Sequence, residues 1–339
     1  MSAQRARVTA LVACLAGVCA LALAACGGSA PRLCNGLASL CGRSLAAIVF
    51  PGTHNSFAAS DEPGWRFTSQ KYGIGKQLDD GIRALLIDVY FGIEDPARGV
   101  VRTDIAASGT KANDVVQAAP PEIRRVAASL GGALGVDLPS TPPKLYLCHV
   151  LCEIGSEPLE QELAVLARFL RTHRRVFLVV IVEDYVPAKD IAAAFERAGL
   201  AERAVTFHLG QALPTLGSLL DDGKQLAVFS ENSGGDPSWY MPAWKFIEDT
   251  PLGAKRPSQL SCARARGDSG SPLLLVNHWI PPFPPSPRLN SEIGRYTYLR
   301  ARVERCMHDR DRDGAIVAVD FYERTSVVDV ARSLNEHGG

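Results

Sequence analysis

The sequence has no excess of charge of either sign, because 36 lysine and arginine residues balance 36 aspartate and glutamate residues. Without a basic patch, the chain lacks the pattern of a nucleic-acid-binding protein, and without an acidic tract it lacks the pattern of a disordered one. No internal repeat is visible, and no Gly-x-Gly-x-x-Gly follows the first expected strand, which disfavours a dinucleotide-binding open sheet. Apolar residues make up 47% of the chain, enough for a large core.

The first 25 residues have the pattern of an export signal. Two arginines near the start are followed by an apolar stretch over residues 8–25, as in secretory signals. Residues 23–26 resemble the lipobox of bacterial lipoproteins, in which the cysteine is acylated and becomes the new N-terminus. Ordinary secretion and an uncleaved anchor are the alternatives, and the short apolar stretch disfavours the anchor. We therefore expect an exported protein, held at the membrane of the cell envelope by a lipid on Cys26.

Export bears on the remaining cysteines. Of nine in the chain, two lie in the signal and Cys26 would carry lipid, which leaves six. An even number in an oxidising compartment predicts disulfides. A zinc site is the rival, but no close pair is a Cys-x-x-Cys and no histidine pair completes a tetrahedral set. Spacing favours three pairs: Cys34–Cys41, Cys148–Cys152 and Cys262–Cys306.

After a tether over residues 26–43, apolar strand-like segments alternate with amphipathic helical ones. Strands are expected at residues 45–49, 84–90, 144–149, 176–183, 204–207, 225–230, 273–278 and 315–320, and helices at 158–171, 188–198 and 326–334. This alternation is typical of an α/β protein with a parallel sheet covered by helices. Eight strands in about 300 residues favour a closed (β/α)8 barrel. We expect one domain over residues 44–337, with long insertions at 92–143 and 231–272.

Polar side chains follow several of these strands at their carboxyl ends. They are His54 and Asn55, Asp88, His149, Glu183, Asn277 and His278, and Asp320. In a barrel these ends meet at one mouth, where active sites lie. Burying such groups without partners costs free energy, and packing alone does not explain so many. Arg83 precedes its strand, which favours a supporting role for it.

Two histidines with carboxylates suit general acid–base chemistry. In phosphodiester cleavage, one histidine takes a proton from the attacking hydroxyl and the other protonates the leaving oxygen. A carboxylate can orient the base and stabilise its charged form. A positive group must also neutralise the charge that develops on phosphorus oxygens. A metal, an arginine or the histidines themselves could supply it.

These residues stand in motifs that resemble those of phosphatidylinositol-specific phospholipases C and of secreted bacterial, fungal and plant phospholipase C-like phosphodiesterases. The matching segments are residues 51–56, 77–83 with 86–88, 148–149, 180–185, 277–279 and 319–321. They follow the order of the family and span residues 44–335. The resemblance implies a distorted TIM barrel.

The resemblance also implies roles for individual residues. His54 would be the general base, His149 the general acid, and Asp320 the carboxylate paired with the base. Asn55, Asp88 and Glu183 would be calcium ligands, and oxygen ligands of this kind suit calcium. Arg83, Asn277 and His278 are candidates for substrate contact or for support of the site.

The sequence departs from the family at two positions. Leu86 stands where calcium-dependent members carry a fourth acidic ligand, and Tyr90 stands where metal-free bacterial members carry an arginine. We nevertheless expect calcium, because Glu183 would otherwise be an unpaired acid beside a phosphate.

We therefore expect an exported, monomeric phosphoric diester hydrolase or lyase that cleaves a phospholipid headgroup or a glycerophosphodiester. One alternative is a non-catalytic surface lipoprotein that binds lipid headgroups or glycans. Another is a glycerophosphodiester phosphodiesterase, disfavoured because those enzymes carry glutamate at the Leu86 position. Residues 309–314 open like a calcium-binding EF-hand loop, but a strand follows instead of a helix, so we expect a solvated turn.

Overall fold

The computed structural model describes residues 32–281 and 285–337, and the chain from Leu33 onward forms one compact unit. The expected signal at residues 1–25 and the expected lipid site at Cys26 lie outside the described residues. None of the helices in the described ranges combines the length and apolar character that crossing a membrane requires.

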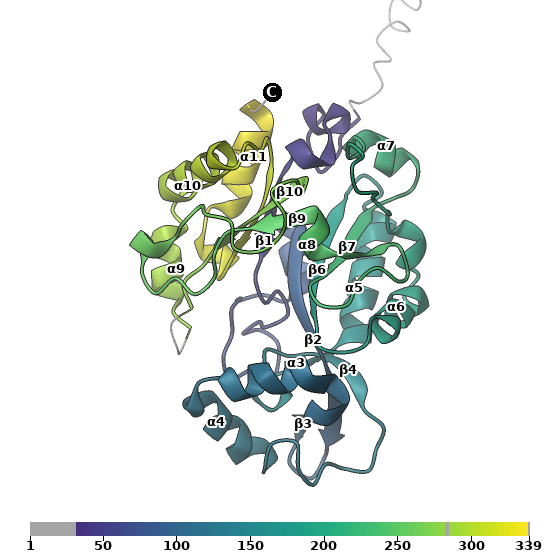
Figure 1. Ribbon diagram of the computed structural model, residues 1–339, viewed down its shortest axis with the longest axis vertical. Helices are drawn as coiled ribbons and strands as arrows, with labels where there is room; N and C mark the ends of the chain where they lie inside the picture. Colours follow the sequence, from purple (N-terminus) through teal and green to yellow (C-terminus); the bar gives the residue numbers. More distant parts are fainter. Residues whose placement is uncertain (1–31, 282–284, 338–339) are drawn as a thin grey trace, which may run out of the picture. The chain divides into compact units, whose positions relative to one another are not determined.

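The secondary structure alternates between strands and helices for most of the chain (Figure 1). The strands are β1 (Val49–Thr53), β2 (Ala84–Asp95), β3 (Val100–Thr103), β4 (Lys144–Leu147), β5 (Glu157–Pro158), β6 (Leu178–Asp184), β7 (Leu226–Ser230), β8 (Tyr240–Pro242), β9 (Ile247–Asp249), β10 (Leu273–His278) and β11 (Ala315–Val319). The helices are α2 (Ile74–Asp79), α3 (Ile105–Ala118), α4 (Pro121–Gly131), α5 (Leu159–Thr172), α6 (Ala188–Arg197), α7 (Leu216–Asp221), α8 (Ala243–Phe246), α9 (Pro287–Ile293), α10 (Tyr296–Asp309) and α11 (Val327–His337).

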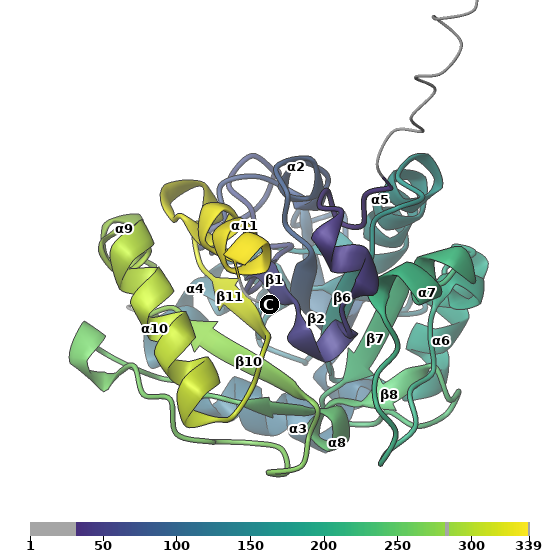
Figure 2. The same ribbon diagram turned by 90° about the horizontal axis from the view of Figure 1, so that it is seen from above.

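Eight strands follow one another in the order β8-β7-β6-β2-β1-β11-β10-β9, and each neighbouring pair runs parallel. Helices α5, α6 and α7 lie on one side of these strands and α9, α10 and α11 on the other (Figure 2). Among the described residues, β8 and β9 are linked by α8 but make no ladder with each other. The expected α/β fold, a distorted (β/α)8 barrel in a single domain, is therefore confirmed, with its opening between β8 and β9.

Three of the expected barrel strands are wrong. The first, at residues 45–49, is displaced: residues 45–47 form a 3-10 helix, and β1 begins only at Val49 and continues through Pro51 and Gly52. The other two do not belong to the barrel. Residues 144–147 form β4, which pairs antiparallel with β2, and residues 204–207 make only an isolated bridge to Leu226. Their places in the barrel are taken by β8 and β9, inside the region read as an insertion. These strands have only three residues each, too few for a readable periodicity.

Successive side chains of the barrel strands enter two different cores, because neighbours on a strand face opposite sides. Leu85, Ile87 and Val89 of β2 pack outward against the helices. Ala84 and Leu86 of the same strand join the barrel interior. Strands buried on both faces read as continuous apolar runs, which is why most of them were visible in the sequence.

The insertion at residues 92–143 forms a lobe beyond one end of the barrel, built from the end of β2 with β3, α3 and α4 (Figure 1). The Asp104 carboxylate accepts a hydrogen bond from the amide of Ala107 at 3.0 Å and caps α3. Gly109, with φ 86°, interrupts this helix. Because β4 returns antiparallel along β2, the lobe brings the residues after β4 back to the barrel.

The three expected disulfides are present: Cys34–Cys41, Cys148–Cys152 and Cys262–Cys306. The EF-hand-like segment is a turn between α10 and β11, as expected. Its Arg312 pairs with the buried Glu248 at 2.8 Å. The turn therefore anchors α10 to the barrel.

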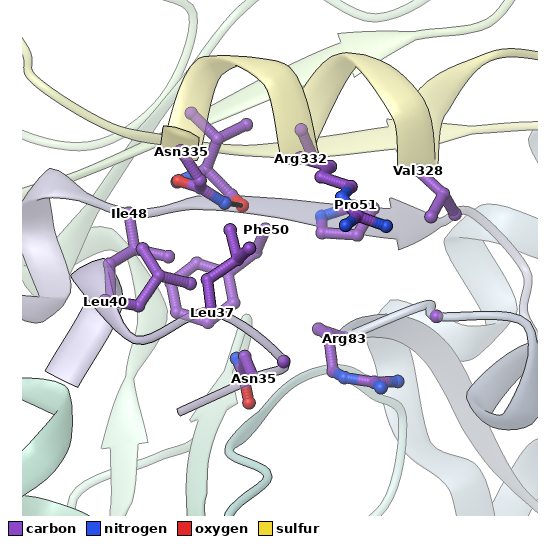
Figure 3. A pocket seen from close by; sticks show the side chains of 14 residues that line it. Asn35, Leu37, Leu40, Ile48, Phe50, Pro51, Arg83, Val328, Arg332 and Asn335 are labelled. Atoms are coloured by element: carbon purple, nitrogen blue, oxygen red, sulfur yellow. Dashed lines mark hydrogen bonds between the residues drawn. The ribbon is translucent and has the colours of Figure 1, made fainter. Parts of the chain in front are cut away.

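A cavity of about 160 Å³ lies at the amino-terminal end of β1, between that strand, α11 and the segment around Leu37 (Figure 3). Arg83 lines it and donates to the carbonyls of Leu78 and Ile82 at 2.8 and 2.7 Å. Burial lowers the pKa of Arg83 to about 10. Arg83 thus supports the start of β2, at the opposite end of the strands from His54.

Candidate active site

Buried side chains hold the loop after β1 in place. Gln70 Nε2 donates to the His54 carbonyl at 2.7 Å, and Gln77 Nε2 donates to the Ser56 carbonyl at 2.6 Å. Asn55 has a φ of 44°, a left-handed conformation that asparagine tolerates. The His54 ring therefore projects from a fixed backbone at the carboxyl end of β1.

His54 and Asp320 form a first histidine–carboxylate pair. His54 Nδ1 lies 2.8 Å from Asp320 Oδ1, and Asp320 is buried at the end of β11. A carboxylate accepts only, so Nδ1 carries a proton, and in the neutral ring Nε2 is then the acceptor nitrogen. The Trp279 ring stacks on His54 at 4.0 Å with an interplanar angle of 8°. These contacts fix the ring and leave Nε2 able to accept a proton.

His149 and Asp88 form a second pair. His149 Nδ1 lies 3.0 Å from Asp88 Oδ2, and 45% of the His149 side chain stays open to solvent. Desolvation at the crowded mouth disfavours its charged form. The Asp88 hydrogen bond and the charges of Asp88, Glu183 and Asp320 more than offset this, so the pKa of His149 is raised. A raised pKa keeps the imidazole protonated, as a general acid requires.

A short disulfide loop carries His149. Cys148 and Cys152 are buried and joined, and Val150 between them has a φ of 69°, which is unusual for a β-branched residue. The amide of Cys152 donates to the Thr103 hydroxyl at 2.8 Å. The loop is thus tied to β3 as well as closed on itself.

The two histidine rings lie edge to face at the mouth, with centroids 6.3 Å apart and an angle of 83° between their planes. In each ring Nδ1 is bound to a carboxylate, and Nε2 has no hydrogen-bond partner among the described residues. Two proton-transfer atoms are therefore free on opposite sides of a gap. This arrangement suits a base and an acid acting on one small group between them.

Further carboxylates surround this gap. Asp88 and Glu183 are register partners on β2 and β6, and Glu183 accepts a hydrogen bond from the Tyr185 hydroxyl. Burial, with the charge of Asp88, raises the pKa of Glu183. Burial also raises the pKa of Glu231 to about 8, although the Arg266 guanidinium opposes this. The raised pKa values show that these clustered carboxyl groups resist ionising together, so a cationic partner at the mouth would be favoured.

A cavity of about 60 Å³ opens between these groups. Its lining is His54, Leu86, Ile87, Asp88, Ile181, Glu183, Glu231, Leu252, Arg266, Asn277 and Trp279. The cavity combines an apolar floor from the barrel interior with polar walls, as ligand sites do.

The structure brings together most of the residues predicted from the sequence. His54, His149, Asp320, Asp88, Glu183 and Asn277 meet at the mouth. His278 does not: its ring is buried on the other face of β10, where Nε2 donates to the Ile293 carbonyl and Nδ1 accepts from Arg302. Burial and Arg302 lower its pKa to about 3. His278 and Arg83 are therefore structural, not in contact with the mouth.

Three residues at the mouth were missed by the sequence interpretation: Glu231, Arg266 and Trp279. Trp279 lies in a recognised motif, but its stacking on His54 depends on the tertiary structure and could not be inferred from the motif. Glu231 directly follows β7, so the strand-end pattern could have found it. Arg266 lies in the segment between β9 and β10, which carries no readable motif.

Comparisons with known proteins identify the family of the chain. The family model described as PI-PLC X 1 matches residues 139–335. Comparison with curated protein sequences gave no match.

Several solved structures resemble the chain. A phosphatidylinositol-specific phospholipase C from Staphylococcus aureus is 13% identical, with a TM-score of 0.50, and the match covers 86% of this chain and 94% of that one. The enzyme of the same name from Listeria monocytogenes is 14% identical, with a TM-score of 0.46 and coverage of 87% and 95%. A putative glycerophosphoryl diester phosphodiesterase from Silicibacter pomeroyi is 14% identical, with a TM-score of 0.35 and coverage of 87% and 97%.

Proposed function

This chain belongs to the PI-PLC X family, whose model matches residues 139–335, and we propose that it is a phosphoric diester hydrolase acting through His54 and His149. The observation that carries the proposal is the pair of histidine–carboxylate contacts, His54 with Asp320 at 2.8 Å and His149 with Asp88 at 3.0 Å, on two rings whose centroids are 6.3 Å apart.

In the proposed reaction, a phosphodiester lies between the two imidazoles. His54 Nε2 takes the proton of a hydroxyl neighbouring the phosphate, and that oxygen forms the new P–O bond. His149 Nε2 gives its proton to the leaving oxygen as the old P–O bond breaks. The products are a cyclic phosphodiester and a free alcohol, and water can open the ring with the histidine roles reversed.

The substrate we propose is a phospholipid headgroup or a glycerophosphodiester. The solved structures named for such substrates share the fold, and the acid–base geometry is suited to either. The three disulfides support export to an oxidising compartment. We propose that a lipid on Cys26 anchors the exported protein to the membrane. Cell fractionation of a Cys26→Ala variant tests this anchor.

Release of a water-soluble phosphorylated headgroup from mixed phospholipid vesicles tests the function. We expect release by the wild-type protein, with a cyclic phosphate detectable by ³¹P NMR. The alternative, a surface protein that only binds headgroups or glycans, predicts vesicle binding with no release. Its weakness is that both histidine pairs are intact.

The metal proposal rests on oxygen donors. Asn55 Oδ1 is buried and has no hydrogen-bond partner among the described residues. Asp88 and Glu183 are register partners on the neighbouring strands β2 and β6, and both line the cavity beside His54. The described residues contain no ready cluster of three histidine, cysteine or acidic side chains. An oxygen-only set still fits calcium by its chemistry, and we propose that Asn55, Asp88 and Glu183 hold it. Bound calcium would supply positive charge beside the phosphate.

Removal of divalent ions tests this proposal. We expect EDTA to lower turnover and calcium to restore it, because Asp88 and Glu183 otherwise leave negative charge beside the substrate. Calcium binding measured by calorimetry should weaken at least about tenfold in Asn55→Ala, since one oxygen ligand is lost. Full activity in chelator, with no calorimetric binding, would show that the reaction is metal-free.

A further inference from the structure

Arg266 is the one lysine or arginine that lines the described cavity beside His54, Asp88 and Glu183. It reaches the mouth from the segment between β9 and β10, not from the end of a barrel strand. Position 90, within β2, holds a tyrosine, and Tyr90 stacks on Tyr185 at 4.4 Å. The fixed positive charge of this cavity therefore comes from an insertion.

Three contacts hold the Arg266 guanidinium from one side. Its Nε and Nη2 donate to Asp249 Oδ2 at 2.9 and 2.6 Å, and its Nη1 donates to Glu231 Oε2 at 2.7 Å. The Trp244 ring lies 3.9 Å from the guanidinium carbon, a favourable cation–π distance. A side chain held this way is oriented before any ligand arrives.

The backbone around Arg266 is fixed as well. The amide of Arg266 donates to Asp249 Oδ1 at 2.8 Å, and the amide of Asp249 donates to the Arg266 carbonyl at 3.1 Å. Upstream in the same segment, the Cys262–Cys306 disulfide joins it to α10. The loop is thus clamped to β9 and α10.

Two of the five N–H groups of Arg266, one on each Nη, have no acceptor in the described part of the chain. About a third of the side chain, 34%, is open, and Arg266 lines the cavity that His54 also lines. Paired N–H groups on a planar fork match two oxygens of a phosphate.

We propose that Arg266 is a catalytic residue that binds the non-bridging oxygens of the substrate phosphate and stabilises the charge that develops on them. The proposal rests on the phosphodiesterase function proposed above. The carboxylates of Asp88, Glu183 and Asp320 repel an anion, and Arg266 would offset this repulsion in addition to the proposed calcium ion. The competing role is structural, a clamp that only holds the β9–β10 segment.

Turnover of four variants separates the two roles. Arg266→Met should lower kcat/KM by about 10²- to 10³-fold, as loss of a charge-stabilising donor does. Arg264→Met is the matched control, because Arg264 is exposed two residues away on the same segment, and it should keep wild-type activity.

Arg266→Lys keeps a positive charge that can pair with Asp249 but loses the planar, two-pronged guanidinium. Its thermal stability should therefore hold while kcat falls at least about tenfold. Arg266→Ala should regain part of its activity with added guanidinium.

Binding of dimethyl phosphate, followed by saturation-transfer NMR of its methyl protons, gives a readout that does not need turnover. Wild type and Arg264→Met should give a signal that Arg266→Met and Arg266→Lys lose or weaken. A wild-type protein that binds through Arg266 but cleaves no diester would sink the proposed function and leave this inference standing. Wild-type activity in Arg266→Lys would overturn the inference, and so would absence of guanidinium rescue. It would also be overturned if dimethyl phosphate did not bind the wild-type protein, or bound wild type and Arg266→Lys equally. These outcomes remain decisive even if Arg266→Met fails to fold.

Discussion

Replacing either His54 or His149 with alanine is expected to lower phosphodiester turnover by about 10²- to 10⁴-fold, the usual contribution of a general acid or base. Each ring has one nitrogen bound to a carboxylate and the other free at the gap. Alanine removes the free nitrogen and leaves the neighbouring strands in place. Headgroup release from vesicles and thermal unfolding of each variant measure the effect.

The control for this experiment is His208→Ala, because His208 is exposed and lies outside the mouth. It should keep wild-type turnover. Unchanged turnover in His54→Ala or in His149→Ala, with the fold kept, would falsify the assignment of that residue. Equal unfolding temperatures in all three variants would show that any loss of activity is chemical.

The pH profile carries a second signature of the same pair. As the proposed general acid, His149 must be protonated, and the charge of Asp88 raises its pKa. The value of kcat/KM is therefore at its full level below the pKa of His149 and falls as the pH rises through that pKa. The alkaline limb of the pH profile should then lie above the ordinary histidine pKa of about 6.5. A limb at or below that value would contradict the assignment of His149 as the acid.

Removing the Cys148–Cys152 disulfide is expected to lower kcat by about 10- to 100-fold, because His149 lies inside this loop and small misplacements of a catalytic group are costly. The expected loss of stability is modest, about 2 kcal/mol for so short a loop. Turnover and denaturant unfolding of the Cys148→Ala/Cys152→Ala double variant measure the two effects separately.

The matched control is the Cys34→Ala/Cys41→Ala double variant. This disulfide also closes a short loop and should contribute about as much stability, but it lies in the N-terminal segment near the cavity at the other end of β1. We expect it to lose stability without losing kcat. Equal turnover in both double variants would show that the Cys148–Cys152 bond does not position His149.

Most of the barrel was predictable because its strands are buried on both faces and read as apolar runs, as residues 178–184 and 273–278 do. The strand predictions that failed concern short segments. Residues 144–147 are also apolar, but periodicity does not distinguish a parallel barrel strand from an antiparallel one. β8 and β9 were missed because three residues carry no pattern.

The candidate site was also predictable only in part from the sequence. His54 and Asp320 directly follow β1 and β11, and Asp88 and Glu183 end the apolar runs of β2 and β6. Their meeting at the mouth could therefore be inferred from the strand-end rule. His149 was assigned correctly to the mouth although its strand is not in the barrel, because it stands in a recognised motif. Which of Asn277 and His278 faces the cavity stayed open, since adjacent strand residues point to opposite sides.

From the sequence alone, the fold class, the favoured disulfide pairs and most residues of the candidate site could be predicted, because burial patterns, cysteine spacing and strand ends are local signals. Only the tertiary structure decided the pairing of His149 with Asp88, the stacking of Trp279 on His54 and the presence of Arg266 in the cavity. The physical reason is distance along the chain. Asp88 and His149 are 61 residues apart, and Arg266 reaches the mouth through contacts to Asp249, Glu231 and Trp244 that no periodicity encodes.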